Sequence, residues 1–432
     1  MDEVTEVDEA QLAVMSADVL NRPDVPYERH DEHFRIDVAG MAWDVAGWLY
    51  EPENGHQLRG SDGKAVGALL LHGGGTDHRF LDNLASILAG KLGIKTLALT
   101  YPGHWYYDSD DHEWPGEPLD EGTGRPRLPI WDRKDPIGHD EYDIVTYADD
   151  PVLHANGGTA FFLAARPGTQ FYRRQAAWPL AYETAYLDAC ARNFPEDEFS
   201  LYLHGHSTGG PQAHMLLQRI ANVRGLIGME TSSFGIIKKK MDPPGAGGEQ
   251  FPFNYLTMRT WRDTARYMGS ESGEMAKRHL PLLMEQVFEA WEKRTGDPGF
   301  KSEQFIQFAG EEALTAAANA VADDQGYDDE ARKALVERYL SYTKPLPVPE
   351  NPSVPPLLYI INEGSRDHRL DNYTSVLLPT LQKFDPVPKA QVYYLRAGIH
   401  NYNRPTPELP RGVAAVGAKI WFDAIRSGYY DS

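Results

Sequence analysis

The chain has 432 residues, of which 41% are hydrophobic and 24% are charged, and this balance excludes a disordered or collagen-like protein. Its 42 Lys and Arg residues stand against 63 Asp and Glu residues, and the net charge of -21 repels phosphate backbones and anionic lipids. We therefore expect neither nucleic acid nor a membrane as a partner. Cys190 is the only cysteine, so no intrachain disulfide, zinc-ribbon cysteine set or Cys-x-x-Cys redox pair can form. The acidic first residues, 1–9, lack the basic and apolar parts of a secretory signal, and we expect a cytoplasmic protein.

The N-terminal part begins with a polar stretch, residues 1–30, which we interpret as an extension. The first part of the core is predicted over 31–233. It opens with two strands, 34–38 and 43–50, that turn at 39–40.

A β-α-β unit follows this predicted hairpin. Residues 66–71 form a continuous apolar run, as in a strand buried on both faces, and the run ends in His72-Gly73-Gly74-Gly75. The next segment carries one helical apolar stripe, formed by Leu81, Leu84, Ala85 and Leu88. A strand over 94–100 completes the unit.

A second unit has the same organisation. It runs from a strand at 199–203 through a glycine-rich turn at 205–210 into an amphipathic helix, and then into a strand at 225–229. Strands that alternate with helices predict an α/β fold with a mostly parallel central sheet flanked by helices.

The sheet pattern is interrupted twice. Residues from about 104 to 174 form an insertion that is rich in aromatic residues, Asp and Pro, and residues 234–354 contain mainly helical segments, such as 279–293 and 328–342. We expect 234–354 to be an inserted helical cap. The second part of the core, 355–432, then supplies strands at 357–361 and 392–395 and a closing helix at 413–425.

The strongest chemical signal is the run Gly205-His206-Ser207-Thr208-Gly209. A serine hydroxyl is a poor nucleophile and needs a base beside it, on a turn too tight for bulky neighbours. The two glycines permit such a turn, which lies between a predicted buried strand and an amphipathic helix, as a nucleophile elbow requires. We predict Ser207 as the nucleophile; a plain glycine turn is the alternative.

From this motif the chain resembles the α/β-hydrolase superfamily, in its serine esterase and lipase branch, over a framework from about Phe34 to Ile425 apart from the two insertions. The resemblance implies a catalytic triad in the chain order Ser, acid, His. It points to Asp367, in the loop after a late core strand, as the acid and to His400, after the last strand, as the base. Glu230 is the alternative acid, because some members carry their acid after the earlier strand.

The resemblance also implies an oxyanion hole, with backbone N–H groups from Thr208 and from Gly74 or Gly75. The His-Gly-Gly-Gly run is similar to the oxyanion loop of hormone-sensitive-lipase-like esterases, but those usually have an acidic residue where this chain has His206. The alternative for this run is a phosphate cradle, although the P-loop lysine and the dinucleotide-binding glycine spacing are both missing.

Two features of the first insertion allow more than one interpretation. The acidic run 108–113 has carboxylates for a divalent cation, but its spacing matches no ordered metal loop, so we favour a solvated loop and predict neither a metal nor a cofactor. Tyr101, His104 and Trp105 follow a strand end, where they either line the substrate pocket or pack the insertion onto the core.

These residues together predict a hydrolase of a carboxylic ester or a related acyl bond in a small-molecule substrate: a lactone, an amide or a thioester. A carbon–carbon hydrolase, a lyase or an acyltransferase would use the same triad, and a non-catalytic binding protein would keep the same fold.

Overall fold

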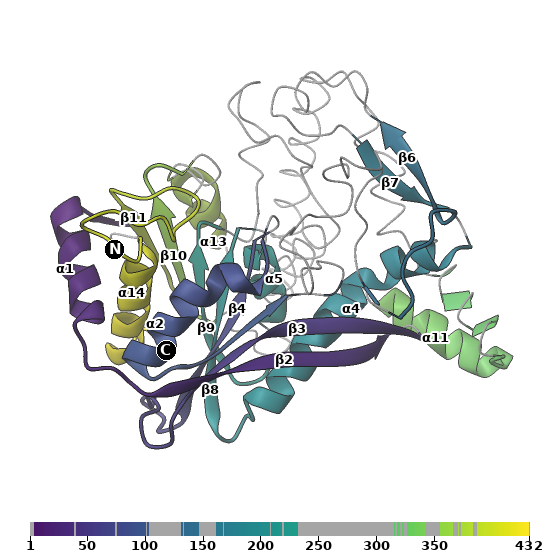
Figure 1. The fold of residues 1–432 in the computed structure, drawn as a ribbon, viewed down its shortest axis with the longest axis horizontal. Coiled ribbons are helices and arrows are strands. Elements are labelled where there is room, and N and C mark those ends of the chain that lie inside the picture. The colour runs from purple at the N-terminus through teal and green to yellow at the C-terminus, as the bar shows by residue number, and fades with distance from the viewer. Residues whose placement is uncertain are drawn as a thin grey trace.

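A large mixed sheet forms the centre of the computed structural model (Figure 1). The structure describes residues 4–38, 40–73, 76–100, 102, 131–132, 134–146, 161–166, 168–207, 209–217, 220–231, 315–341 in part, 355–365, 370, 373–382 and 387–431.

Nine strands of the described chain make up this sheet, in the spatial order β1-β11-β10-β9-β8-β4-β5-β3-β2. In chain order the strands are β1 (Val4–Val7), β2 (Tyr27–Val38), β3 (Met41–Pro52), β4 (Ala65–Leu71), β5 (Lys95–Thr100), β8 (Phe199–His206), β9 (Val223–Met229), β10 (Leu357–Asn362) and β11 (Ala390–Leu395). At one end of the sheet β2 and β3 form an antiparallel hairpin, and β3 pairs antiparallel with β5. Every other pairing in this sheet is parallel. The predicted fold class, a mostly parallel sheet flanked by helices, is confirmed.

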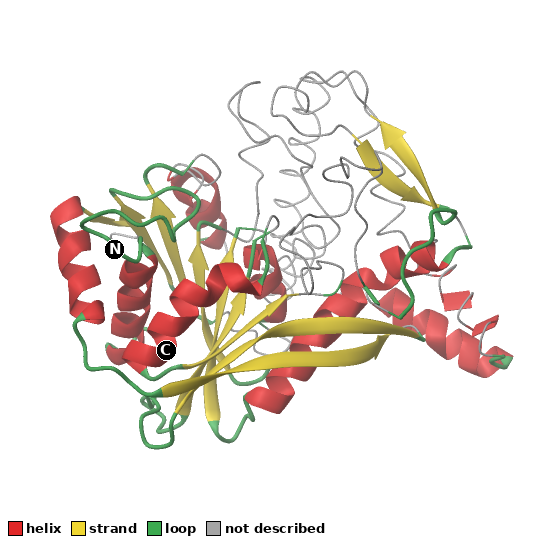
Figure 2. Cartoon of the chain, viewed as in Figure 1, coloured by secondary structure: helices red, strands yellow, loops and turns green. Residues whose placement is uncertain are grey.

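Helices cover both faces of this sheet (Figure 2). On one face α1 (Glu9–Leu20), α2 (Asp82–Leu92) and α14 (Ala414–Arg426) contact one another. On the other face lie α4 (Gln170–Asn193) and α5 (Gly209–Leu216), and a short π-helical turn (Tyr373–Leu377) leads into α13 (Leu378–Leu381). Both faces of β4 and β8 are buried by these layers, which explains the continuous apolar sequence of β4.

The N-terminal segment differs from the predicted extension, because it belongs to the core. β1 pairs in parallel with β11 and places Val7 in the interior. In another part of the chain, a short 3₁₀ helix (His78–Leu81) directly precedes α2. Asp8 starts α1 with a capping box that includes Gln11. A strand of four residues with two exposed polar side chains carries too little pattern to be recognised in the sequence.

The two insertions are described only in part. In the first, β6 (Tyr142–Thr146) and β7 (Phe161–Ala165) form a separate antiparallel pair. In the second, the helix predicted at 328–342 is confirmed as α11 (Asp329–Ser341), which lies past the turn of the β2–β3 hairpin (Figure 1). The helix predicted at 279–293 lies outside the described residues, and the cap as a domain stays a prediction. Within the described part of the chain, no helix is both long and apolar enough to span a membrane.

Candidate active site

Three of the predicted site residues follow strands of the parallel sheet. Ser207 follows β8, Glu230 follows β9, and His400 lies in the loop after β11. The carboxyl ends of parallel strands meet at one edge of a sheet, and this edge is where open α/β sheets bind ligands.

Ser207 occupies a sharp turn between β8 and α5 and has a left-handed backbone, with φ of 51°. A Cβ atom on Gly205 would lie 2.7 Å from the backbone nitrogen of Gly210, and one on Gly209 would lie 2.7 Å from the carbonyl oxygen of His72. Both positions therefore require glycine. A strained, partly exposed serine between a buried strand and a helix, at the carboxyl edge of this sheet, has the strand-turn-helix setting that a nucleophile elbow requires. The chain has the α/β-hydrolase fold.

The turn that carries Ser207 is held from the neighbouring strand. The Thr231 hydroxyl, just after β9, donates a hydrogen bond to the carbonyl oxygen of Ser207, and the Tyr373 hydroxyl donates to the carbonyl oxygen of Thr231. Thr231 and Tyr373 are both fully buried. This chain of hydrogen bonds compensates for the unfavourable backbone of Ser207, because a strained residue persists only where its surroundings fix it.

Glu230 and His400 are in direct contact. Oε2 of Glu230 lies 3.3 Å from Nδ1 of His400, and the side chains are 1% and 27% exposed, respectively. In a neutral imidazole Nδ1–H donates to this carboxylate, which leaves the lone pair on Nε2. Nε2 is then the ring atom that can accept a proton.

The carboxylate of Glu230 is buried but receives several hydrogen bonds. The backbone N–H of Asn362 donates to Oε1, and the Ser365 side chain also forms a hydrogen bond with the carboxylate. Burial raises the pKa of Glu230, although the hydrogen bonds from His400, Ser365 and Asn362 oppose this shift. Glu230 also has a left-handed backbone, with φ of 56°, which costs energy in a residue other than glycine.

His206, the residue before the nucleophile, contacts the loop that carries His400. Its Nε2 lies 3.0 Å from the carbonyl oxygen of His400. The centroids of the two imidazole rings are 4.9 Å apart. The His206 ring also packs against Phe80 at 4.8 Å and against Tyr402 at 5.0 Å.

The glycine-rich loop after β4 passes directly beside the elbow. A Cβ atom on Gly73 would lie 2.9 Å from Nδ1 of His206 and 3.0 Å from Cβ of Ser207. Burial lowers the pKa of the adjacent His72 to about 4, and its Nδ1–H donates to the Gly73 carbonyl oxygen. The loop predicted to form the oxyanion hole therefore starts within contact distance of the predicted nucleophile.

The structure brings Glu230 to His400, and it brings His400 to His206 beside Ser207. The other predicted site residues lie outside the described residues: Asp367, Gly74, Gly75, Thr208, Tyr101, His104 and Trp105. The sequence interpretation did not assign roles to His206 and Thr231. Their positions, directly before Ser207 and directly after Glu230, are the signal that could have identified them.

No group of three or more His, Cys, Asp or Glu side chains in the described ranges is arranged to hold a metal ion. The acidic run 108–113 lies outside those ranges.

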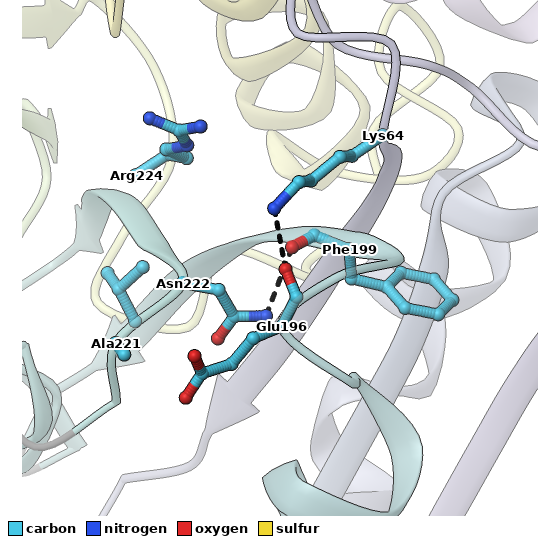
Figure 3. Close-up of a pocket in the computed structure, with 7 residues that line it drawn as sticks. Lys64, Glu196, Phe199, Ala221, Asn222 and Arg224 are labelled. Atoms are coloured by element: carbon cyan, nitrogen blue, oxygen red, sulfur yellow. Dashed lines mark hydrogen bonds between the residues drawn. The ribbon is translucent and has the colours of Figure 1, made fainter.

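A small pocket of about 220 Å³ lies at the opposite edge of the sheet, near the amino ends of β4, β8 and β9 (Figure 3). Three of the polar side chains that line it are already paired: Nζ of Lys64 donates to the Glu196 carbonyl oxygen, Asn222 donates to that of Phe199, and Arg224 pairs with Asp62. This pocket is separated from Ser207 by the length of β8, so it is not part of the candidate active site.

No family model matches the chain, and no curated protein matches it. Solved structures that resemble it include an S-formylglutathione hydrolase from Staphylococcus aureus, with 12% identity, 93% of this chain and 98% of that chain covered, and a TM-score of 0.36. Another is a cold-adapted esterase from an Arctic intertidal metagenomic library, with 14% identity, 92% and 96% covered, and a TM-score of 0.34. A haloalkane dehalogenase variant from Bradyrhizobium elkanii has 12% identity, 94% and 99% covered, and a TM-score of 0.37.

Proposed function

We propose that the chain is a serine hydrolase that cleaves a carboxylic ester or a related acyl bond through an acyl-enzyme on Ser207. The observation that carries this proposal is the strained elbow of Ser207, with φ of 51°, beside a histidine whose Nδ1 is 3.3 Å from a buried carboxylate. A nucleophile, a base and an orienting acid are the three groups that acyl transfer by a serine requires.

In this mechanism the Oγ atom of Ser207 attacks the acyl carbonyl carbon, and its proton passes to Nε2 of His400. The tetrahedral intermediate collapses when the bond to the leaving group breaks and His400 returns the proton to that group. Water then attacks the acyl-enzyme with His400 again as the base, which releases the acid and restores Ser207. No other reactant is needed.

We infer that Glu230 is the acid of this triad. Its carboxylate accepts Nδ1–H of His400, fixes the tautomer and stabilises the imidazolium that forms during each proton transfer. The contacts around Glu230 support this role, because donors from Asn362 and Ser365 keep a buried carboxylate hydrogen-bonded. Asp367 stays the competing assignment.

Backbone N–H groups of Thr208 and of Gly74 or Gly75 are proposed to bind the oxyanion, each contributing roughly 2.7–4 kcal/mol to transition-state stabilisation. The contact between Gly73 and the elbow supports this assignment, since it places the start of the glycine loop next to the reacting serine. The cap at 234–354 is proposed to cover the substrate pocket.

A fluorophosphonate probe tests the nucleophile directly, because it reacts with activated serines. We expect the wild-type chain to be labelled and Ser207→Ala to be unlabelled with its fold intact. Ser200→Ala is the matched control, since Ser200 is a buried serine on the same strand that pairs with Asp62 at the far edge of the sheet. This control should be labelled like the wild type.

A folded wild-type chain that stays unlabelled, or equal labelling of Ser207→Ala, would contradict the serine-hydrolase proposal. Once labelling is established, a panel of esters, lactones, amides and thioesters measures which acyl bond is cleaved fastest.

A further inference from the structure

We propose that His206 is a positioning residue: its hydrogen bond to the loop of the catalytic base, His400, holds that loop against the nucleophile elbow. We call this hydrogen bond the latch. The proposal rests on the proposed function of His400 and assigns a role to a residue that takes no part in the chemistry itself. It follows from one hydrogen bond and the packing around it.

The hydrogen bond has a defined direction. The partner of His206 Nε2 is the main-chain carbonyl oxygen of His400, 3.0 Å away, and a carbonyl oxygen can only accept. Nε2 of His206 therefore carries the proton. Because the acceptor of this bond is the backbone of His400 itself, the bond restrains the Cα position from which the catalytic imidazole extends.

The position of His206 makes this bond effective. The residue is the last of β8, is 3% exposed, and directly precedes Ser207. Phe80 and Tyr402 pack against its ring, so the ring has little freedom to turn away. A single side chain thus ties the base loop to the strand that carries the nucleophile. Misplacement of a reacting group by about 1 Å can cost about 100-fold in rate.

His204 offers a contrast on the same strand. It is fully buried two residues earlier, stacks on Trp421 with ring centroids 6.2 Å apart, and its two ring nitrogens have no hydrogen-bond partner among the described residues. Burial lowers its pKa to about 3, so it is a neutral packing residue. The same substitution at His204 and at His206 should therefore have different consequences.

The test uses two substitutions that separate donation from packing. His206→Phe keeps an aromatic ring but removes the donor, whereas His206→Gln keeps an N–H donor but removes the ring. We expect His206→Phe to lower kcat by about 10- to 100-fold with KM nearly unchanged, since the bond positions the base and not the substrate. His206→Gln should retain activity within a few-fold of the wild type. His204→Phe is the control and should leave kcat unchanged.

Hydrogen exchange measured by mass spectrometry on peptides that cover 397–404 gives a readout that does not depend on catalysis. Without the donor the loop should open more often, so these peptides should exchange faster in His206→Phe and at the wild-type rate in His206→Gln and His204→Phe. A purely packing role for His206 predicts the opposite order of the two His206 variants.

The latch is overturned if His206→Phe exchanges and turns over like the wild type, or if His206→Gln is as impaired as His206→Phe. Failure of the proposed function is seen separately: the wild-type chain would then resist the fluorophosphonate probe, while the exchange of 397–404 would still respond to His206→Phe.

Discussion

The turns after β9 and β10 are neighbours at the same edge of the sheet, yet they have different roles. The β9 turn presents the carboxylate of Glu230 to His400 from a left-handed backbone. The β10 turn supplies hydrogen-bond donors to that carboxylate, from the backbone of Asn362 and the side chain of Ser365. A buried charge is costly unless it is hydrogen-bonded. The donors of the β10 turn therefore lower the cost of burying the Glu230 carboxylate of the β9 turn. The hydrogen bonding of the Glu230 carboxylate therefore depends on the strand beside β9.

The largest effect should come from exchanging the acids of these two turns for amides. If the β9 turn supplies the acid, Glu230→Gln should lower kcat by about 10³- to 10⁴-fold, because the amide cannot hold the same tautomer and charge on His400. Asp367→Asn, in the chain that continues from the β10 turn, should then have near-normal rates. Steady-state kinetics on the best substrate, with circular dichroism to verify folding, make the measurement.

The reverse result, with a large loss in Asp367→Asn and little change in Glu230→Gln, would move the acid to the β10 turn and make Glu230 a structural residue.

A smaller effect is expected from the link between the β9 turn and the elbow. Thr231→Val removes the hydroxyl that donates to the Ser207 carbonyl oxygen but keeps the shape of the side chain. Loss of one partner from a buried hydrogen bond costs about 1–3 kcal/mol, so we expect lower thermal stability and about a 10-fold lower kcat. Thr231→Ser keeps the hydroxyl and should stay close to wild type. Equal behaviour of the two variants would show that the hydroxyl does not support the elbow.

The smallest effect is a change of thermal stability with pH that comes from the ionisation of Glu230. Burial raises the pKa of Glu230 above its usual 4.5, so the folded chain binds this proton more tightly than the unfolded chain does. Ionisation then lowers the free energy of unfolding as pH rises above about 4.5. Glu230→Gln cannot ionise, and its Tm relative to wild type should increase between pH 4.5 and the higher pH at which Glu230 is fully ionised in the folded chain.

Thermal unfolding of Glu230→Gln across this pH range is compared with Glu363→Gln, which removes a carboxylate of the β10 turn that is 48% exposed. A Tm difference that stays constant with pH, or shrinks as pH rises, would contradict the raised pKa.

Much of the framework was predictable because its signals are local. The apolar run of β4, the glycine spacing around Ser207 and the stripe of α2 each lie within a few residues of sequence. The four-residue β1 was not predicted as a strand, because it is stabilised by pairing with β11 at the far end of the chain and not by its own pattern.

The candidate site divides in the same way. The position of Ser207 on a tight strand-turn-helix and that of His400 after the last strand could both be predicted from local sequence, since glycine spacing and strand order can be recognised along the chain. Only the tertiary structure decided which carboxylate meets His400: Glu230 is 170 residues away from it and reaches it because β9, β10 and β11 pair side by side. Local sequence carries no information about such a contact, because the parallel sheet creates it by bringing distant strand ends to one edge.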